Sequence, residues 1–230
     1  MVNAADPSSE ARVLEIATGP GHVAFEFAQK CDEVVGIDIT EAPLEIARER
    51  KQEQNVKNIS FEKGDAEDLS FGDNSFDIVV CRLAFHHFEN PGTVLQEMSR
   101  ICCSEGTVAV DDITVSEFPG RASYQNRFEQ LRDPSHVRAL PRSELLELFT
   151  ECNIEVTSVG SDVVVQQVDD WLDLAQTSTS QAETVRDLIE EDANDNLSGT
   201  RPFWQGNELY FTQQTTVVVG RPLNELKINK

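Results

Sequence analysis

The sequence is short of basic residues. Its 230 residues include 19 lysines and arginines against 41 aspartates and glutamates, which leaves a formal net charge of -22. Nucleic acids and anionic membranes bind through basic patches, so we expect neither of them as a partner. The acidic balance indicates a solvated acidic surface, and it leaves a saline habitat open as its cause.

Long hydrophobic runs are also missing. No stretch approaches the roughly 18 consecutive apolar residues that a bilayer-spanning helix needs, so we expect no membrane insertion. The segment from Met1 to Arg12 has neither the basic start nor the apolar run of a secretory signal. We therefore expect a cytoplasmic protein.

Cysteine is sparse and irregularly placed. The 5 cysteines form an odd number, and no C-x-x-C pair occurs. A disulfide framework or a cysteine metal site needs paired spacing, so we predict reduced thiols and no metal site. Cys81 and Cys102 fall in apolar patterns and are predicted to be core residues.

Alternating strand and helix patterns are what the sequence does contain. Short apolar runs are followed by helical patterns, with strands expected near residues 12–17, 33–38, 59–63, 76–81, 106–111, 154–159 and 210–219. Such βαβ repeats predict an α/β fold, a doubly wound Rossmann-like sheet with helices on both faces. We expect about seven mostly parallel strands, the last of them an antiparallel edge strand.

We interpret residues 1–230 as a single domain. The regular alternation breaks at about residues 113–141, where Pro119 and Gly120 interrupt the pattern, so we expect an irregular cover or insertion there. Amphipathic patterns predict a helical element at about residues 168–192.

A glycine loop joins the first strand to the first long helix. In Gly19-Pro20-Gly21 the missing side chains let backbone N–H groups approach a ligand closely. The loop fits the dinucleotide fingerprint G-x-G-x-x-A, and Asp38 ends the second strand as a ribose-binding acid would. An NAD(P)-dependent oxidoreductase is therefore one open alternative, although no hydride-transfer pair such as Tyr-x-x-x-Lys is evident.

Five blocks in sequence order resemble the class I S-adenosylmethionine-dependent methyltransferases. They are Glu15-x-Ala17-x-Gly19-x-Gly21 and the segments 34–38, 64–69, 76–82 and 84–88. The chain looks most similar to the small-molecule group that includes the ubiquinone/menaquinone C-methyltransferases. The resemblance implies transfer of a methyl group from S-adenosylmethionine to a small-molecule acceptor, with S-adenosylhomocysteine as product.

The resemblance also implies a set of cofactor-binding residues. Glu15 would attract the methionine ammonium, directly or through water, and Asp38 would accept both ribose hydroxyls. Ile39 would flank the adenine. The remaining members of the set are Ala17, Thr18, Gly19 and Gly21 in the loop, Asp65 and Ala66 at the adenine edge, and Arg82 after the fourth strand.

Each of the acidic assignments has a structural alternative. Glu15 could cap loop amides, Asp38 could cap a helix, and Asp65 could be a turn residue after a glycine. Arg82 could form an ordinary salt bridge. The sequence alone leaves these alternatives open.

His86 and His87 are the candidate catalytic residues. Methyl transfer to a protonated nucleophile needs a base, and histidine has a suitable pKa near neutral pH. We expect His87 to face the substrate. The alternative is that both histidines pack within the cofactor pocket.

Two features depart from the family pattern. Ala17 replaces the first glycine of the loop motif, and alanine fits there without strain if its φ is negative. The motif also begins a dozen residues into the chain, whereas family members usually carry one or two helices before it. We therefore expect a more open site, or one closed by the cover segment or a partner chain in a homo-oligomer. A catalytically inactive cofactor-binding or regulatory protein of the same fold stays open.

Overall fold

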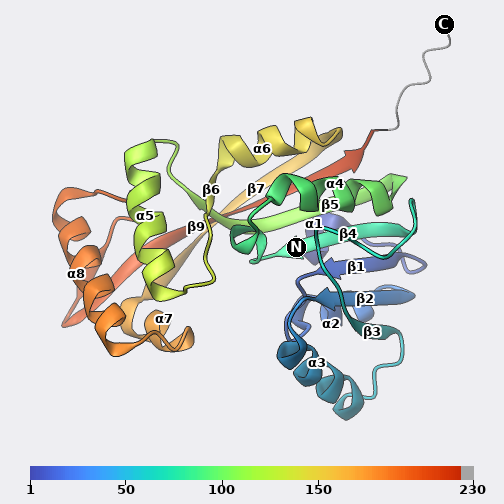
Figure 1. Ribbon diagram of the computed structural model, residues 1–230, viewed down its shortest axis with the longest axis horizontal. Helices are drawn as coiled ribbons and strands as arrows, with labels where there is room; N and C mark the ends of the chain where they lie inside the picture. Colours follow the sequence, from blue (N-terminus) through green and yellow to red (C-terminus); the bar gives the residue numbers. More distant parts are fainter. Residues whose placement is uncertain (224–230) are drawn as a thin grey trace, which may run out of the picture.

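The computed structural model describes residues 1–223, whose strands form one mixed sheet (Figure 1). Its main path runs β3-β2-β1-β4-β5-β9-β7, and all pairings from β3 to β5 are parallel. The strands on this path are β1 (Arg12–Ile16), β2 (Glu33–Asp38), β3 (Ile59–Lys63), β4 (Phe76–Arg82), β5 (Cys102–Val115), β7 (Ile154–Gln167) and β9 (Glu208–Pro222). Two short strands, β6 (Leu140–Pro141) and β8 (Phe203–Gln205), pair with β5 and β9. The predicted α/β class and mostly parallel sheet are confirmed.

The position of the last strand differs from the prediction. β9 is antiparallel to both neighbours, but it lies between β5 and β7 and not at the edge. Chain order does not determine order in a sheet, because a returning strand can enter between two earlier ones. The apolar run Val217–Val219 was the available signal, since such runs are typical of strands covered on both faces.

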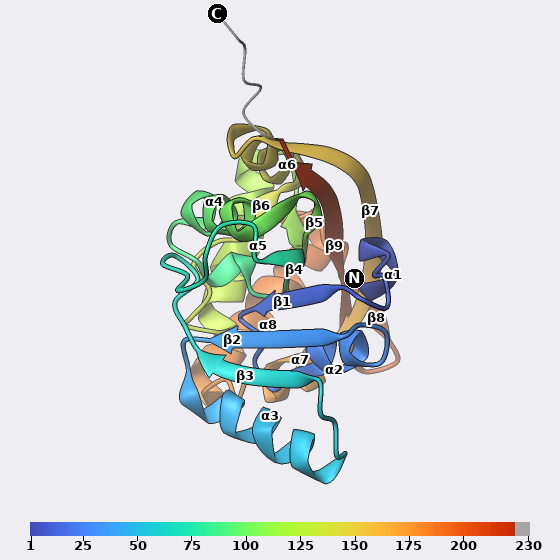
Figure 2. The same cartoon turned by 90° about the vertical axis from the view of Figure 1, so that its right-hand side faces the viewer.

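Helices cover both faces of the sheet (Figure 2). On one face α1 (Val2–Ala5), α2 (His22–Ala28) and α3 (Glu41–Glu53) bury apolar residues against the strands. On the other face α4 (Pro91–Ile101) and α6 (Arg142–Glu151) do the same. This double covering explains why β1 and β4 are almost continuously apolar.

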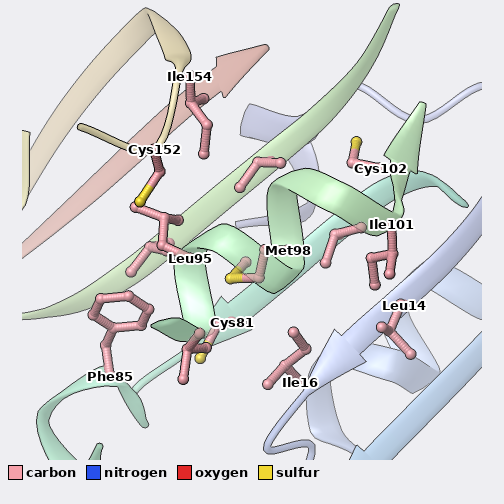
Figure 3. Packing of buried hydrophobic residues seen from close by; sticks show 14 of the residues in the cluster. Leu14, Ile16, Cys81, Phe85, Leu95, Met98, Ile101, Cys102, Cys152 and Ile154 are labelled. Atoms are coloured by element: carbon pink, nitrogen blue, oxygen red, sulfur yellow. The ribbon is translucent and has the colours of Figure 1, made fainter. Parts of the chain in front are cut away.

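Figure 3 shows how α4 packs on the central strands. Leu95, Met98 and Ile101 lie three residues apart on one helical face, and all three are fully buried. They belong to the same apolar cluster as Leu14 of β1 and Cys81 of β4. Cys81 and Cys102 are both buried in this cluster, so their prediction as core residues is confirmed.

The prediction of an irregular segment at residues 113–141 was wrong for most of its length. β5 continues to Val115, and α5 (Pro119–Arg132) is a regular helix of 14 residues. Pro119 does not break this helix, because proline is well suited to the first turn, where its missing N–H has no partner to lose. Only the short connections over residues 116–118 and 133–139 are irregular.

An end lobe lies at the carboxyl ends of β5 and β7 and the amino end of β9. It consists of α5, α7 (Val168–Leu174), α8 (Thr179–Asp195) and β8, and it lies away from α3 and β3 in Figure 1. Phe128, Trp171 and Phe211 pack edge to face in its own apolar cluster. The helical element predicted at residues 168–192 is confirmed by α7 and α8. Within residues 1–223 no helix combines the length and the apolar character needed to cross a membrane.

Candidate functional site

A cavity of about 730 Å³ opens at the carboxyl ends of β1, β2 and β4. This is the edge at which open α/β sheets bind their ligands. Its lining brings together six of the predicted site residues, which are Ala17, Asp38, Ile39, Asp65, Ala66 and His87. Segments far apart in the sequence therefore converge on one hollow.

The loop after β1 has a left-handed backbone at three positions. Ala17 has a φ of 52°, Gly19 of 53° and Gly21 of 80°. The condition under which alanine fits without strain, a negative φ, is therefore not met, and a non-glycine residue in this conformation costs about 1–2 kcal/mol. At Gly21 a Cβ would lie 2.7 Å from the Phe61 ring, so only glycine fits where α2 begins.

Glu15 holds this loop from inside. Its carboxylate accepts hydrogen bonds from the Thr18 hydroxyl at 2.6 Å and from the Ala24 N–H at 2.8 Å. Burial raises the pKa of Glu15 to about 7, although both hydrogen bonds favour the charged form. Glu15 does not line the cavity, so the structure shows the loop-capping arrangement that the sequence left open.

Asp38 joins the loop to the start of α3. One carboxylate oxygen accepts the Gly19 N–H at 2.9 Å and the other accepts the Thr40 N–H at 2.8 Å. Each oxygen of a carboxylate has about two acceptor sites, so each can take one further donor. Beside it Ile39 is 63% exposed, an unusual state for a large apolar residue, and it forms an apolar part of the cavity wall.

Asp65 ends the segment after β3 in a tight turn. Its Oδ1 accepts the Glu67 N–H at 2.9 Å, and its Oδ2 accepts no hydrogen bond within residues 1–223. The turn arrangement and a free oxygen at the cavity wall therefore coexist in one residue.

Arg82 lies outside this cavity. Its Nε donates to Asp111 Oδ2 at 3.3 Å, and its side chain borders a second hollow. The ion pair is the arrangement that the sequence left open as an alternative to a cofactor contact.

His86 forms a buried pair with Asp112. The ring Nδ1 lies 2.6 Å from Asp112 Oδ1, and the His86 backbone N–H donates to Asp112 Oδ2 at 3.1 Å. Burial lowers the pKa of His86, but the charge and hydrogen bond of Asp112 outweigh it, and the pKa is raised. Sequence reasoning missed Asp112, although a second acid inside the apolar run of β5 was an available signal.

His87 is the histidine that lines the cavity. Its Nδ1 lies 2.9 Å from the Ser135 carbonyl oxygen, which can only accept, so Nδ1 carries the hydrogen and Nε2 is a free acceptor. Burial lowers the pKa of His87, and the nearby charge of His86 lowers it further; the two ring centroids are 4.1 Å apart. His87 is thus held as a neutral imidazole.

No group of three or more His, Cys, Asp and Glu side chains in residues 1–223 is arranged to hold a metal ion. The groups at the cavity wall include the Asp38 carboxylate between two amides, the Asp65 carboxylate, the exposed Ile39 side chain and the His87 imidazole.

Comparison with known proteins identifies the family. Residues 7–181 match the family model described as "Methyltransferase domain". An uncharacterized methyltransferase, YcgJ of Bacillus subtilis, is 35% identical over 172 residues, which cover 75% of this chain and 68% of that protein. A demethylmenaquinone methyltransferase of Deinococcus radiodurans is 36% identical over 117 residues, half of this chain and 46% of its own length.

Solved structures agree with this assignment. The crystal structure of YcgJ superposes with a TM-score of 0.92 and 28% identity, and the match covers 97% of both chains. A putative methyltransferase of Bacillus halodurans superposes with a TM-score of 0.91 and 28% identity over 96% of both chains. These matches favour methyl transfer over the oxidoreductase alternative. The chain belongs to the methyltransferase-domain family and is an enzyme of methyl transfer.

Proposed function

We propose that the methyl donor is S-adenosylmethionine, that the 730 Å³ cavity holds it, and that the acceptor is a small molecule. The proposal rests mainly on Asp38, whose two carboxylate oxygens lie between the glycine loop and α3. Each oxygen accepts one backbone N–H and can accept one further hydrogen bond. A ribose diol presents two donors at the spacing of a carboxylate's two oxygens.

The other walls fit the rest of a nucleoside. Ile39 offers an apolar surface for a base, and Asp65 Oδ2 is a free acceptor beside Ala66 for an exocyclic amino group. An added Cβ at Gly19 would meet nothing within 4 Å, so there is open space beside the loop at this position.

The bound donor would supply a methyl carbon on a positively charged sulfur, and the C–S electron pair would stay on the sulfur as the acceptor's lone pair forms the new bond. The protein's contribution is alignment and exclusion of water. Where the acceptor atom carries a proton, His87 Nε2 takes it, because Ser135 fixes the hydrogen on Nδ1.

His86 acts through His87 and is a positioning residue. The Asp112 carboxylate holds its ring and its backbone N–H, which fixes the short helical turn that carries both histidines. Its charge beside His87 favours the neutral form of the base.

Asp38→Ala tests the cofactor assignment. The substitution removes two charge-assisted hydrogen bonds of about 1.5–3 kcal/mol each, so S-adenosylhomocysteine should bind at least tenfold more weakly in calorimetry. Asp32 is an exposed acid that directly precedes β2, at the end of the strand away from Asp38. Asp32→Ala is therefore the matched control and should bind S-adenosylhomocysteine with wild-type affinity. Unchanged affinity in Asp38→Ala would remove the ribose contact.

His87→Ala tests the base. An acceptor can be found by screening phenols and amines for transfer of a radiolabelled methyl group. With that acceptor, the turnover of His87→Ala should fall, while its cofactor affinity should stay within about twofold of the wild-type value. Wild-type turnover would remove His87 from the mechanism.

A further inference from the structure

A second hollow of about 480 Å³ lies on one face of the sheet, where β5, β9 and β7 run beyond the cofactor cavity. Residues two apart on β7 line it, namely Gly160, Asp162, Val164 and Gln166, together with Ser161, and so do Gln213, Thr215 and Val217 on β9. This spacing of two shows that one sheet face forms its floor.

The strand register assembles this floor in rows. Arg82 pairs with Asp111, Asp111 with Val217, and Val217 with Gly160, so one row crosses four strands. A Cβ at Gly160 would lie 2.9 Å from Val217 Cγ1, so the glycine keeps the floor low at that point.

The hollow adjoins the cofactor cavity at Leu83. This side chain lines both spaces, is 39% exposed, and has a left-handed backbone with a φ of 50°. Its N–H donates to the Asp111 carbonyl at 2.8 Å, which holds it at the junction. A molecule in the hollow can therefore present one end to the cofactor cavity.

The charged groups around the hollow are two carboxylates and one guanidinium. Among its lining residues Arg82 is the only cation, and its Nε already donates to Asp111. Asp162 adds a second carboxylate, which accepts only the Val163 N–H within residues 1–223. This charge balance disfavours an anion and favours a molecule that donates hydrogen bonds.

A buried glutamate orients the far wall. Glu129 is 2% exposed and accepts from Gln213 Nε2 at 2.8 Å, so the Gln213 amide oxygen must point the other way. That oxygen accepts from Gln166 Nε2 at 3.2 Å, and within residues 1–223 Gln166 Oε1, the last group of this hydrogen-bonded series, accepts no hydrogen bond.

We propose that this second hollow binds the methyl acceptor, and that it selects neutral or cationic small molecules which present a hydroxyl or amino group to Gln166 Oε1 and Asp162. The inference rests on the proposed function, because it places the acceptor beside the cofactor cavity. It adds the class of acceptor and the residues that recognise it.

Matched aromatic probes test the proposal in methyl NMR spectra of protein saturated with S-adenosylhomocysteine. Tyramine and 4-ethylphenol should shift the methyl signals of Val164 and Val217, and 4-hydroxyphenylacetate, which exchanges ammonium for carboxylate, should bind at least about tenfold more weakly than tyramine. Gln166→Leu should weaken the binding of tyramine about fivefold. Gln214→Leu, the same change on the opposite face of β9, should leave the affinity for tyramine unaltered.

Two results would overturn the proposal: equal binding of 4-hydroxyphenylacetate, or no shift at Val164 and Val217 with either donor probe. The Ile39 methyl reports the cofactor cavity separately. If S-adenosylhomocysteine fails to shift Ile39, the proposed function fails. Titration of the cofactor-free protein with the same three probes then still tests whether the second hollow binds molecules that donate hydrogen bonds.

Discussion

The walls of the proposed cofactor cavity come from short segments after β1, β2, β3 and β4 and from Ser135, whereas the second hollow lies across the middle of β7 and β9. In the cavity Asp38 is held by near neighbours and the adjacent loop, at Thr40 and Gly19, whereas His87 is held by Ser135, 48 residues away. In the hollow, Gln213 is held by Glu129, 84 residues away on α5. Local motifs thus build the Asp38 side of the cavity, and long-range contacts build its His87 side and the hollow.

The end lobe adds a third contrast, because its core is separate from the clusters under the cofactor cavity. The account therefore expects changes in the lobe to reduce stability without altering cofactor binding. Changes at the glycine loop and the histidines should leave the packing of the lobe core unaltered.

The largest effect is expected from Phe211→Ala in the lobe core. Phe211 is fully buried and packs against Phe128 and Trp171, so its loss should cost about 3–5 kcal/mol of unfolding free energy. Urea unfolding measures the loss. Calorimetry on the folded variant should give wild-type affinity for S-adenosylhomocysteine, and a large loss of affinity would show that the two regions are coupled.

Glu15→Gln should change the pH dependence of stability. The folded pKa of Glu15 is raised to about 7 from 4.5, so its contribution to stability is full below pH 4.5 and is lost as the pH rises through 7. This loss amounts to roughly 3 kcal/mol between pH 4.5 and 8. Urea unfolding across that range should show the loss in wild type and in the exposed control Glu10→Gln, but not in Glu15→Gln. An unchanged pH profile in Glu15→Gln would contradict the buried position of this carboxyl.

Asp112→Asn should separate the two histidines. Without the carboxylate the pKa of His86 falls, and since His86 then loses its charge, the pKa of His87 rises. Loss of a charge-assisted hydrogen bond should also cost about 1.5–3 kcal/mol of stability. NMR titration of the imidazole signals measures both pKa values; movement of the two in the same direction would be inconsistent with this coupling.

Ala17→Gly should have the smallest effect, and it should be stabilising. The substitution relieves about 1–2 kcal/mol of strain from the left-handed backbone of the folded state. Because glycine also raises the entropy of the unfolded chain, about 0.4–1 kcal/mol is lost, and the unfolding free energy should rise by roughly 0.5–1 kcal/mol. In the control Ala42→Gly, on the exposed side of α3, the sign should reverse. Destabilisation by Ala17→Gly, measured by urea unfolding, would show that the alanine methyl packs favourably in the cavity wall.

These contrasts explain what could be predicted from the sequence. Strand and helix periodicity predicted β3 at its observed bounds, and motif order placed Asp38, Asp65 and His87 near one edge of the sheet. The apolar run Val217–Val219 indicated that β9 is covered on both faces, but its neighbours β5 and β7 could not be predicted, because pairing between distant strands leaves no local signal. The partnership of His86 with Asp112 depends on the same long-range pairing of β4 and β5.

The most direct test of the central claim is calorimetric titration of the wild-type protein with S-adenosylmethionine, S-adenosylhomocysteine and NAD. Asp38 and its neighbours are expected to bind the methyl donor and its product at one site per chain, with no measurable heat from NAD. Binding of NAD without binding of either methionine compound would contradict the account.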